Sequence, residues 1–232
     1  MNNFNAQTTL STAKPEEIRD WAIAKLEKKL AACIEDTAKR FAAWTDEEIK
    51  AALGKRDQKK LATGKLTIED ARRLLKLKDC KGDIADNEKA IADIKAAFAK
   101  ELPKTIRIDV EWKKSATWGF NPKAEVWADG YSASEFIGGC GYDKESTATA
   151  RAFENNPVFA RIVATCAWLD EKETKATGEQ KHTYGYYSSY SGFRFEGAVG
   201  FECHRTIIER AGYRLVAEFH PKAADGYRFE KI

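Results

Sequence analysis

The sequence predicts an α+β fold in which an N-terminal helical hairpin or small bundle precedes a mostly antiparallel sheet with helices on one face. Apolar residues recur at helical spacing up to about residue 102, and they alternate with polar residues directly after Pro103. Twelve of the 15 glycines follow residue 104, and all eight tyrosines follow residue 130. We therefore expect a frayed leader over residues 1–14, a helical region over 15–102 and an α+β domain over 103–232.

The helical region begins with a long amphipathic helix. Pro15 is followed by two glutamates, a pattern typical of a first helical turn, and apolar residues then continue at helical spacing to Trp44. Thr45 and Glu48 have the spacing of a capping box, which predicts a short second helix. We expect Gly54 to end that helix in the left-handed conformation.

Two further helices are expected before the sheet. Thr67 and Asp70 repeat the capping-box spacing and predict the start of a third helix. A fourth is expected over residues 83–102, with Pro103 as its stop.

The α+β region alternates strands and helices. Strict alternation predicts a strand over 106–113, a hairpin with a second strand over 123–128, and a third strand over 131–137. Two closing strands are expected over 213–219 and 227–232. The helices between them are predicted by apolar periodicity over 146–153, 158–169 (followed by a charged loop over 170–180) and 202–210.

Two glycine-rich turns each join a strand to a helix, over 136–142 and 195–201. An internal duplication and convergence on the same turn both remain open. Backbone N–H groups at such helix starts bind anions, so Lys144, Ser146 and Thr147 are candidate anion-binding residues. The alternative is that the glycines only allow the strand and helix to pack closely.

Two resemblances are carried by the first glycine turn. The segment 138–147, GGCGYDKEST, together with 195–213, resembles a family of uncharacterised proteins from phages and mobile elements. Residues 83–154 are more distantly similar to the double-stranded-RNA-binding domain. That similarity implies a phosphate contact for Lys144, whereas Glu145 and Ala148 stand at positions where that family has lysines.

The densest basic region lies between residues 55 and 81. On short helices it is suited to follow a phosphate backbone, and we take Arg72, Arg73 and Lys76 as candidate nucleic-acid contacts. Interleaved acidic residues also fit a solvated helix face.

A tyrosine-rich segment over 184–192 combines aromatic, serine and glycine residues, the composition of many binding loops. Its candidate partner-binding residues are Tyr184, Tyr186, Tyr187 and Tyr190. The alternative is that these rings simply cover the sheet.

Catalytic and metal sites have weak support. The net charge of +3 is too small for a dedicated duplex-DNA binder, and five scattered cysteines form no metal-binding or disulfide pattern. Cys140 at a helix start is the best nucleophile candidate, with His182, His204 or His220 as its base. We predict no catalytic residue, no metal and no cofactor.

The leading expectation is a non-enzymatic binding protein of phage or mobile-element type that engages a nucleic acid or a host nucleoprotein complex. The alternatives are an anti-CRISPR-like inhibitor of a host defence system acting by protein contact, and a thiol-dependent enzyme using Cys140. No stretch is apolar enough to cross a membrane and the first residues lack a signal-peptide pattern, so we expect a cytoplasmic protein, in the host cell if it is phage-encoded. A homodimer through the N-terminal helices is also expected.

Overall fold

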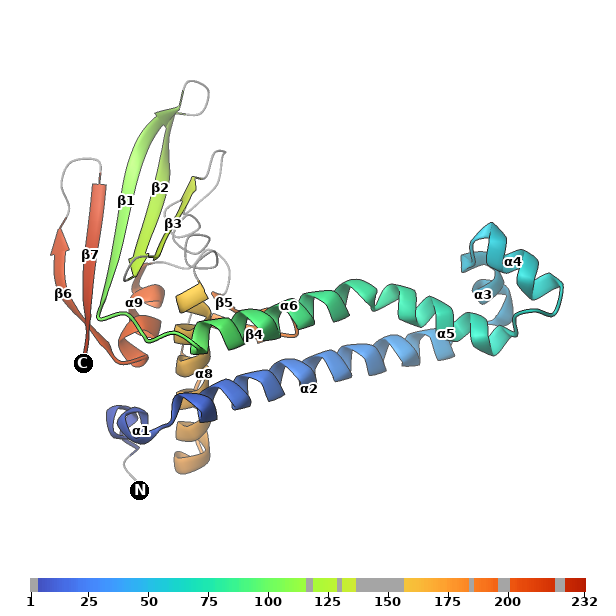
Figure 1. Ribbon diagram of the computed structural model, residues 1–232, viewed down its shortest axis with the longest axis horizontal. Helices are drawn as coiled ribbons and strands as arrows, with labels where there is room; N and C mark the ends of the chain where they lie inside the picture. Colours follow the sequence, from blue (N-terminus) through green and yellow to red (C-terminus); the bar gives the residue numbers. More distant parts are fainter. Residues whose placement is uncertain are drawn as a thin grey trace. The chain divides into compact units, whose positions relative to one another are not determined.

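The protein is described by a computed structural model over residues 4–115, 119–128, 131–136, 157–183, 186–195, 201–219 and 224–232 (Figure 1). The chain divides into two compact units. The sheet unit comprises residues 1–23, 92–188 and 192–232, and the helical unit comprises 24–91 and 189–191. The fold class is α+β, as the sequence predicts.

The sheet unit contains a five-stranded sheet with the order β3-β2-β1-β7-β6, in which neighbouring strands are antiparallel. The predicted hairpin of the first two strands, the third strand and both closing strands are confirmed, although β2 starts four residues and β7 three residues earlier than expected. The strands are β1 (Thr105–Ser115), β2 (Gly119–Ala128), β3 (Tyr131–Phe136), β6 (Tyr213–Phe219) and β7 (Ala224–Lys231).

One face of this sheet is buried along its central strands. Ile106 pairs with Phe229 and Ile108 with Tyr227, and none of the four is more than 5% exposed. On the opposite face Arg228 donates to Asp109 at 2.9 Å. Alternation on β1 therefore separates an apolar face from a charged one, as expected of a sheet covered on one side.

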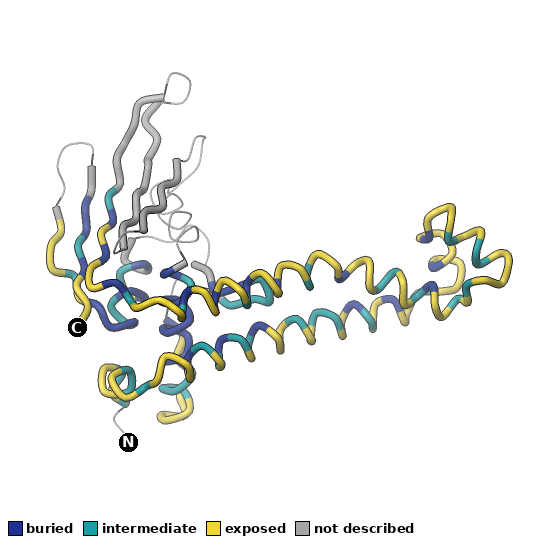
Figure 2. The backbone as a smooth tube through the Cα atoms, in the orientation of Figure 1, coloured by how far each residue is buried: buried dark blue, intermediate teal, exposed yellow. Residues whose placement is uncertain are grey.

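Within the described part of the sheet unit, three complete helices accompany the sheet: α1 (Ala6–Thr12), α8 (Pro157–Thr177) and α9 (Phe201–Arg210). Residues 161–170 of α8 are all buried, so α8 is the central helix of this unit's core (Figure 2). The charged loop predicted over 170–180 is wrong, because α8 continues to Thr177. Glu171 and Lys175 pair at 2.7 Å one turn apart, and such pairs favour helix over loop.

The leader also differs from expectation. Residues 6–12 are helical rather than frayed, and the Asn5 side chain caps this helix by accepting from Thr8 N at 3.0 Å. Leu10 packs against a buried cluster of Ile18, Trp168 and Leu169, which ties the short helix to the core.

The helical unit is built on an antiparallel pair of helices. α2 (Pro15–Ala42) and α6 (Lys81–Phe98) each belong partly to it, and they run side by side there (Figure 1). The Asn87 side chain donates to the Leu26 carbonyl at 3.1 Å, and Cys33 donates to Asp83 at 3.4 Å. α6 ends at Phe98, four residues before the predicted boundary.

A β-hairpin made of β4 (Tyr186–Ser189) and β5 (Gly192–Phe195) forms the tyrosine-rich segment. Its turn, residues 189–191, belongs to the helical unit.

Candidate nucleic-acid interface

Three short helices close the helical unit at one end: α3 (Asp46–Ala52), α4 (Lys55–Ala62) and α5 (Ile68–Asp79). We call them the tip. Both predicted capping boxes are confirmed, with Thr45 and Glu48 at the start of α3 and Thr67 and Asp70 at the start of α5. Two of the three helices of the tip therefore start with local capping hydrogen bonds, which were predictable from the sequence.

A small apolar core holds the tip together. Ile49 and Ala71 are fully buried, and Phe41 and Leu53 are at most 6% exposed. The rings of Phe41 and Trp44 meet edge to face at 4.7 Å. Further partly buried side chains from α4, α5 and the segment between them complete the cluster, namely Leu61, Leu66, Ile68 and Leu75.

The helix α4 was not expected from the sequence. Gly54 does not end α3 in the left-handed conformation; its φ is −66° and it stands at the N-cap of α4. The C-terminus of α4 is closed instead by Gly64 at φ +71°, with Gly64 N bonded to Leu61 O at 3.1 Å and Lys65 N to Lys60 O at 2.9 Å. This Schellman motif turns the chain sharply at Lys65.

Positive charge is concentrated on α4 and α5. Residues 55–81 hold ten Lys or Arg and four Asp or Glu, a net charge of +6 for a chain whose total is +3. Among the described residues, only Lys60 and Arg72 of these ten form ion pairs within 4 Å. The other eight, which we call the tip cations, are Lys55, Arg56, Lys59, Lys65, Arg73, Lys76, Lys78 and Lys81.

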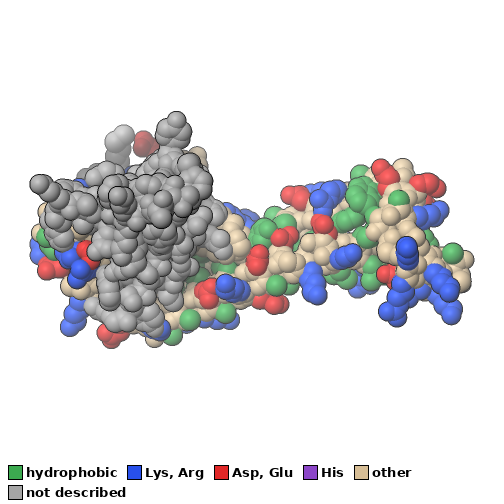
Figure 3. Space-filling view, turned by 90° about the horizontal axis from the view of Figure 1, so that it is seen from above, with side chains coloured by type: hydrophobic (Ala, Val, Ile, Leu, Met, Phe, Trp, Pro, Cys, Tyr) green, Lys and Arg blue, Asp and Glu red, His purple; other side chains and the backbone are tan. Residues whose placement is uncertain are grey.

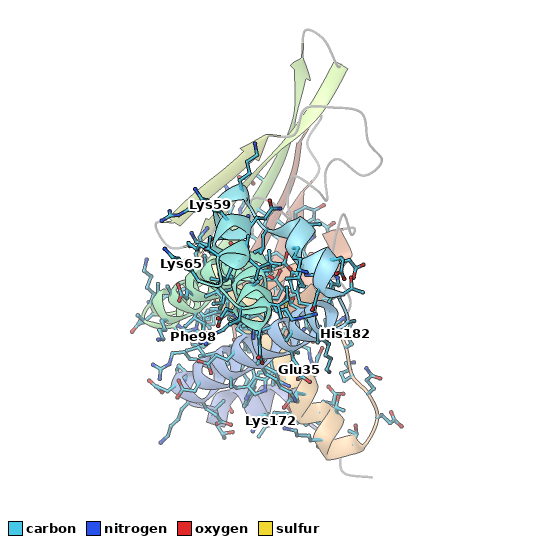
Figure 4. All side chains as sticks on the ribbon, turned by 90° about the vertical axis from the view of Figure 1, so that its right-hand side faces the viewer. Glu35, Lys59, Lys65, Phe98, Lys172 and His182 are labelled. Carbon is cyan, nitrogen blue, oxygen red and sulfur yellow. The ribbon has the colours of Figure 1, made fainter. Side chains whose placement is uncertain are left out.

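The tip cations face solvent. All but Lys76 are in the exposed class, and Lys76 is half-buried. Figure 3 shows Lys and Arg side chains gathered at the α3–α5 end of the helical unit, and Figure 4 shows Lys59 and Lys65 extending outward from it. Because none of these groups forms an ion pair within 4 Å with a described residue and cations outnumber carboxylates ten to four over residues 55–81, the surface keeps a net positive potential.

The pKa of Asp57, a residue of α4, responds to these positive charges. Its carboxylate accepts from Lys60 at 2.8 Å, and this hydrogen bond lowers the pKa of Asp57. The charges of Arg56 and Lys78 lower it further. One carboxylate surrounded by three cations neutralises at most one of them.

Two of the tip cations stand where they oppose helix stability. Lys55 and Arg56 are the first two residues of α4, where the helix dipole favours carboxylates over cations. Basic residues at this end cost a few tenths of a kcal/mol each. A local conflict of this kind is typical of residues kept for binding rather than for folding.

The three predicted nucleic-acid contacts on α5, Arg72, Arg73 and Lys76, differ in how far they are exposed. Arg72 is turned inward: it donates to the Phe41 carbonyl at 2.7 Å and to Asp46 at 2.9 Å, and its side chain is 25% exposed. It therefore joins α5 to α2 and α3. Arg73 is exposed and Lys76 is half-buried, and both remain available to a ligand.

The other predicted anion-binding residues, Lys144, Ser146 and Thr147, lie outside the described residues, as do both glycine turns. The exposed cations of α4 were recognised in the sequence only as part of a basic region. The sequence feature that could have predicted α4 was the position of these cations directly after Gly54, which is its N-cap.

The tyrosine-rich segment is engaged internally where it is described. Tyr186 is 5% exposed and its hydroxyl donates to Asp170 at 2.8 Å; burial, followed by the charge of Asp170, raises its pKa. The Tyr190 hydroxyl donates to Asp83 at 2.5 Å, which raises the pKa of Tyr190 to about 12, and its carbonyl accepts from Asn87 at 2.8 Å. Tyr184 and the side chain of Tyr187 lie outside the described residues.

Asp170 is the centre of a buried polar cluster in the sheet unit. It is 1% exposed and accepts hydrogen bonds from the backbone and hydroxyl of Thr183, from Tyr186, and from Arg210 Nε at 2.9 Å. Arg210 also pairs with Glu173. Every contact is to another side chain or backbone group of this unit, so the cluster joins α8, α9 and β4.

The described cysteines lack the features of a nucleophile. Cys80 and Cys166 are at most 2% exposed, and burial raises the pKa of the Cys166 thiol to about 12. Cys33 is half-buried, and burial and Asp83 raise its pKa as well. The predicted nucleophile, Cys140, and one candidate base, His220, lie outside the described residues; His182 is exposed and His204 is buried.

We expect Cys166 in the folded protein to resist alkylation throughout the neutral pH range, because a thiol with a pKa near 12 carries almost no reactive thiolate there. Iodoacetamide labelling followed by peptide mass spectrometry should show Cys166 unmodified in buffer and modified in denaturant. Rapid labelling of Cys166 in buffer would contradict the buried environment.

No protein-family model, curated protein or solved structure matches this chain. Within the described part of the chain, no group of three or more His, Cys, Asp or Glu residues is placed to hold a metal ion. No described helix is both long and apolar enough to cross a membrane.

Proposed function

We propose that this protein is a non-enzymatic nucleic-acid-binding protein of phage or mobile-element type, and that the tip contacts the phosphate backbone. The observation that carries the proposal is the set of eight tip cations, on α4, on α5, between them and at the start of α6, none of which forms an ion pair within 4 Å with a described residue. Their number would allow several phosphate contacts at once, which is the dominant source of affinity for nucleic acids. The ligand is a nucleic acid itself or the nucleic-acid part of a host nucleoprotein complex.

The chemistry of the tip favours recognition without base specificity. Lysine predominates among the tip cations, and its flexible ammonium neutralises a phosphate as a point charge. The two arginines, Arg56 and Arg73, are the groups able to bind a phosphate in bidentate fashion. We therefore expect similar affinities for unrelated sequences of the same length.

Binding should fall steeply with salt. With up to eight phosphate contacts on duplex DNA, the slope of log Kobs against log salt should lie between roughly −4 and −7, since each contact contributes about −0.9. Fluorescence anisotropy with labelled duplex DNA, duplex RNA and single-stranded RNA, titrated between about 50 and 300 mM KCl, measures this slope. A slope near zero, or no binding at the lowest salt, would rule the proposal out.

A second candidate is an inhibitor of a host defence system that acts through protein contact. It is favoured by Leu74 and Leu77, which are 43% and 50% exposed on α5 beside the tip cations. Exposed leucines of this kind are typical of a protein interface. The same salt titration separates the two candidates, because a partner held by apolar contacts stays bound at high salt.

A further inference from the structure

A cavity of about 270 Å³ lies within the sheet unit, away from any residue of the tip. It is bordered by α1, the beginning of α2, the end of α6 and the segment after it, α8, the turn after α9 and the end of β7. Its wall has an apolar part, formed by Leu10, Ile18, Phe98, Leu102, Ala211 and Ile232, and a polar part that includes Arg161 and Lys231.

Arg161 brings a buried positive charge to the polar part of this wall. The side chain extends from α8, and the residue is only 8% exposed. Its guanidinium lies over the ring of Phe98, with 4.8 Å between Cζ and the ring centroid, and its Nη1 donates to the Lys100 carbonyl. Phe98 is labelled in Figure 4.

No carboxylate in the described part of the chain forms an ion pair with Arg161 within 4 Å, and Glu16 acts on it only at longer range. Burial lowers the pKa of Arg161, as expected for a cation removed from water. The Arg161 guanidinium carries five N–H donors, and the Lys100 carbonyl and the Phe98 ring engage only some of them.

A more open depression adjoins the cavity. It shares Pro15, Leu102, Arg161, Lys231 and Ile232 with the cavity wall, so the guanidinium borders both spaces. A ligand therefore has a route to Arg161 from the surface.

We infer that the cavity binds a small organic carboxylate whose apolar group occupies the space between α1, α2 and α8 and whose carboxylate pairs with Arg161. The planar fork of a guanidinium matches a carboxylate in bidentate geometry, and the apolar part of the wall suits a hydrocarbon group better than a free inorganic anion does. This inference is independent of the nucleic-acid proposal, because the tip contributes no residue to the cavity.

Octanoate is the test ligand, with 1-octanol as the uncharged control of equal chain length and inorganic phosphate as the control without an apolar group. Binding is followed by ¹H–¹⁵N NMR shifts of the Gly212 and Ile232 amides, which belong to the cavity wall. We expect saturable shifts with octanoate and at least tenfold weaker binding of both controls, since a charge-assisted hydrogen bond is worth about 10- to 100-fold in affinity.

Two variants test the residues named. Arg161→Met should weaken octanoate binding about tenfold or more while 1-octanol binding stays the same. Leu102→Trp retains the guanidinium and fills the cavity, so it should abolish octanoate binding even if Arg161→Met does not fold. The inference would be overturned by the absence of saturable shifts with octanoate, or by 1-octanol or phosphate binding as tightly as octanoate. It would also be overturned if folded Leu102→Trp bound octanoate as well as the unchanged protein does.

Discussion

Replacing Asp170 with asparagine should lower the free energy of unfolding by about 3 kcal/mol. The carboxylate is 1% exposed and accepts from Thr183, Tyr186 and Arg210. An amide of the same shape removes the negative charge that faces the half-buried Arg210 and presents an N–H group to donors. Breaking a buried pair costs about 3–5 kcal/mol, and we expect the lower end because Arg210 keeps its contact with Glu173.

Urea unfolding followed by circular dichroism measures this loss, and two matched carboxylates provide controls. Glu173→Gln removes the more exposed partner of Arg210 while Asp170 remains, so it should cost about 1 kcal/mol. Glu179→Gln, at an exposed position after α8, should change stability by less than about 0.5 kcal/mol. If Asp170→Asn were as mild as Glu179→Gln, the cluster would not be holding α8, α9 and β4 together.

The strands were predictable because their signal is local. Residues 105–109 of β1 alternate between the buried and the charged face, so Ile106 and Ile108 identify the strand and its inner face. The capping boxes at Thr45 and Thr67 were predictable for the same reason, since both partners lie within four residues.

The helices that the sequence missed are stabilised by distant contacts. The segment 6–12 has one strongly apolar residue, Leu10, whose packing partners Trp168 and Leu169 lie more than 150 residues away. The segment 55–62 likewise has one, Leu61, which packs into the tip core. Short polar segments of this kind have no periodicity to detect, and tertiary packing decides their conformation.

The sequence predicted that the candidate site is a basic region, but it did not predict which of its residues face solvent. Arg72 and Arg73 are equivalent in the sequence, yet Arg72 bonds to Phe41 and Asp46, which lie 31 and 26 residues earlier. Tyr186 and Tyr190 were similarly ambiguous, because a tyrosine suits a binding surface and a buried hydrogen bond equally well. Composition does not encode which way such a side chain points.

Removing four tip cations should nearly eliminate nucleic-acid binding. In the variant Lys55→Gln, Arg56→Gln, Lys59→Gln and Lys65→Gln, affinity at about 0.1 M salt should fall on the order of 10³-fold, because each lost phosphate contact contributes about 0.9 to the salt exponent. The salt slope should become less steep by about 3 to 4. Stability should stay the same or rise slightly, since Lys55 and Arg56 oppose the dipole of α4.

The matched control removes the same amount of charge from the sheet unit, through Lys14→Gln, Lys95→Gln, Lys175→Gln and Lys181→Gln at exposed positions. Anisotropy with one labelled duplex compares the two variants at equal net charge. If only the tip variant loses affinity and salt dependence, the phosphates are contacted at α4 and α5. If the control loses as much, binding depends on total charge and the tip is not the interface. If neither does, the interface lies elsewhere, and the exposed leucines of α5 become the stronger candidates for a protein partner.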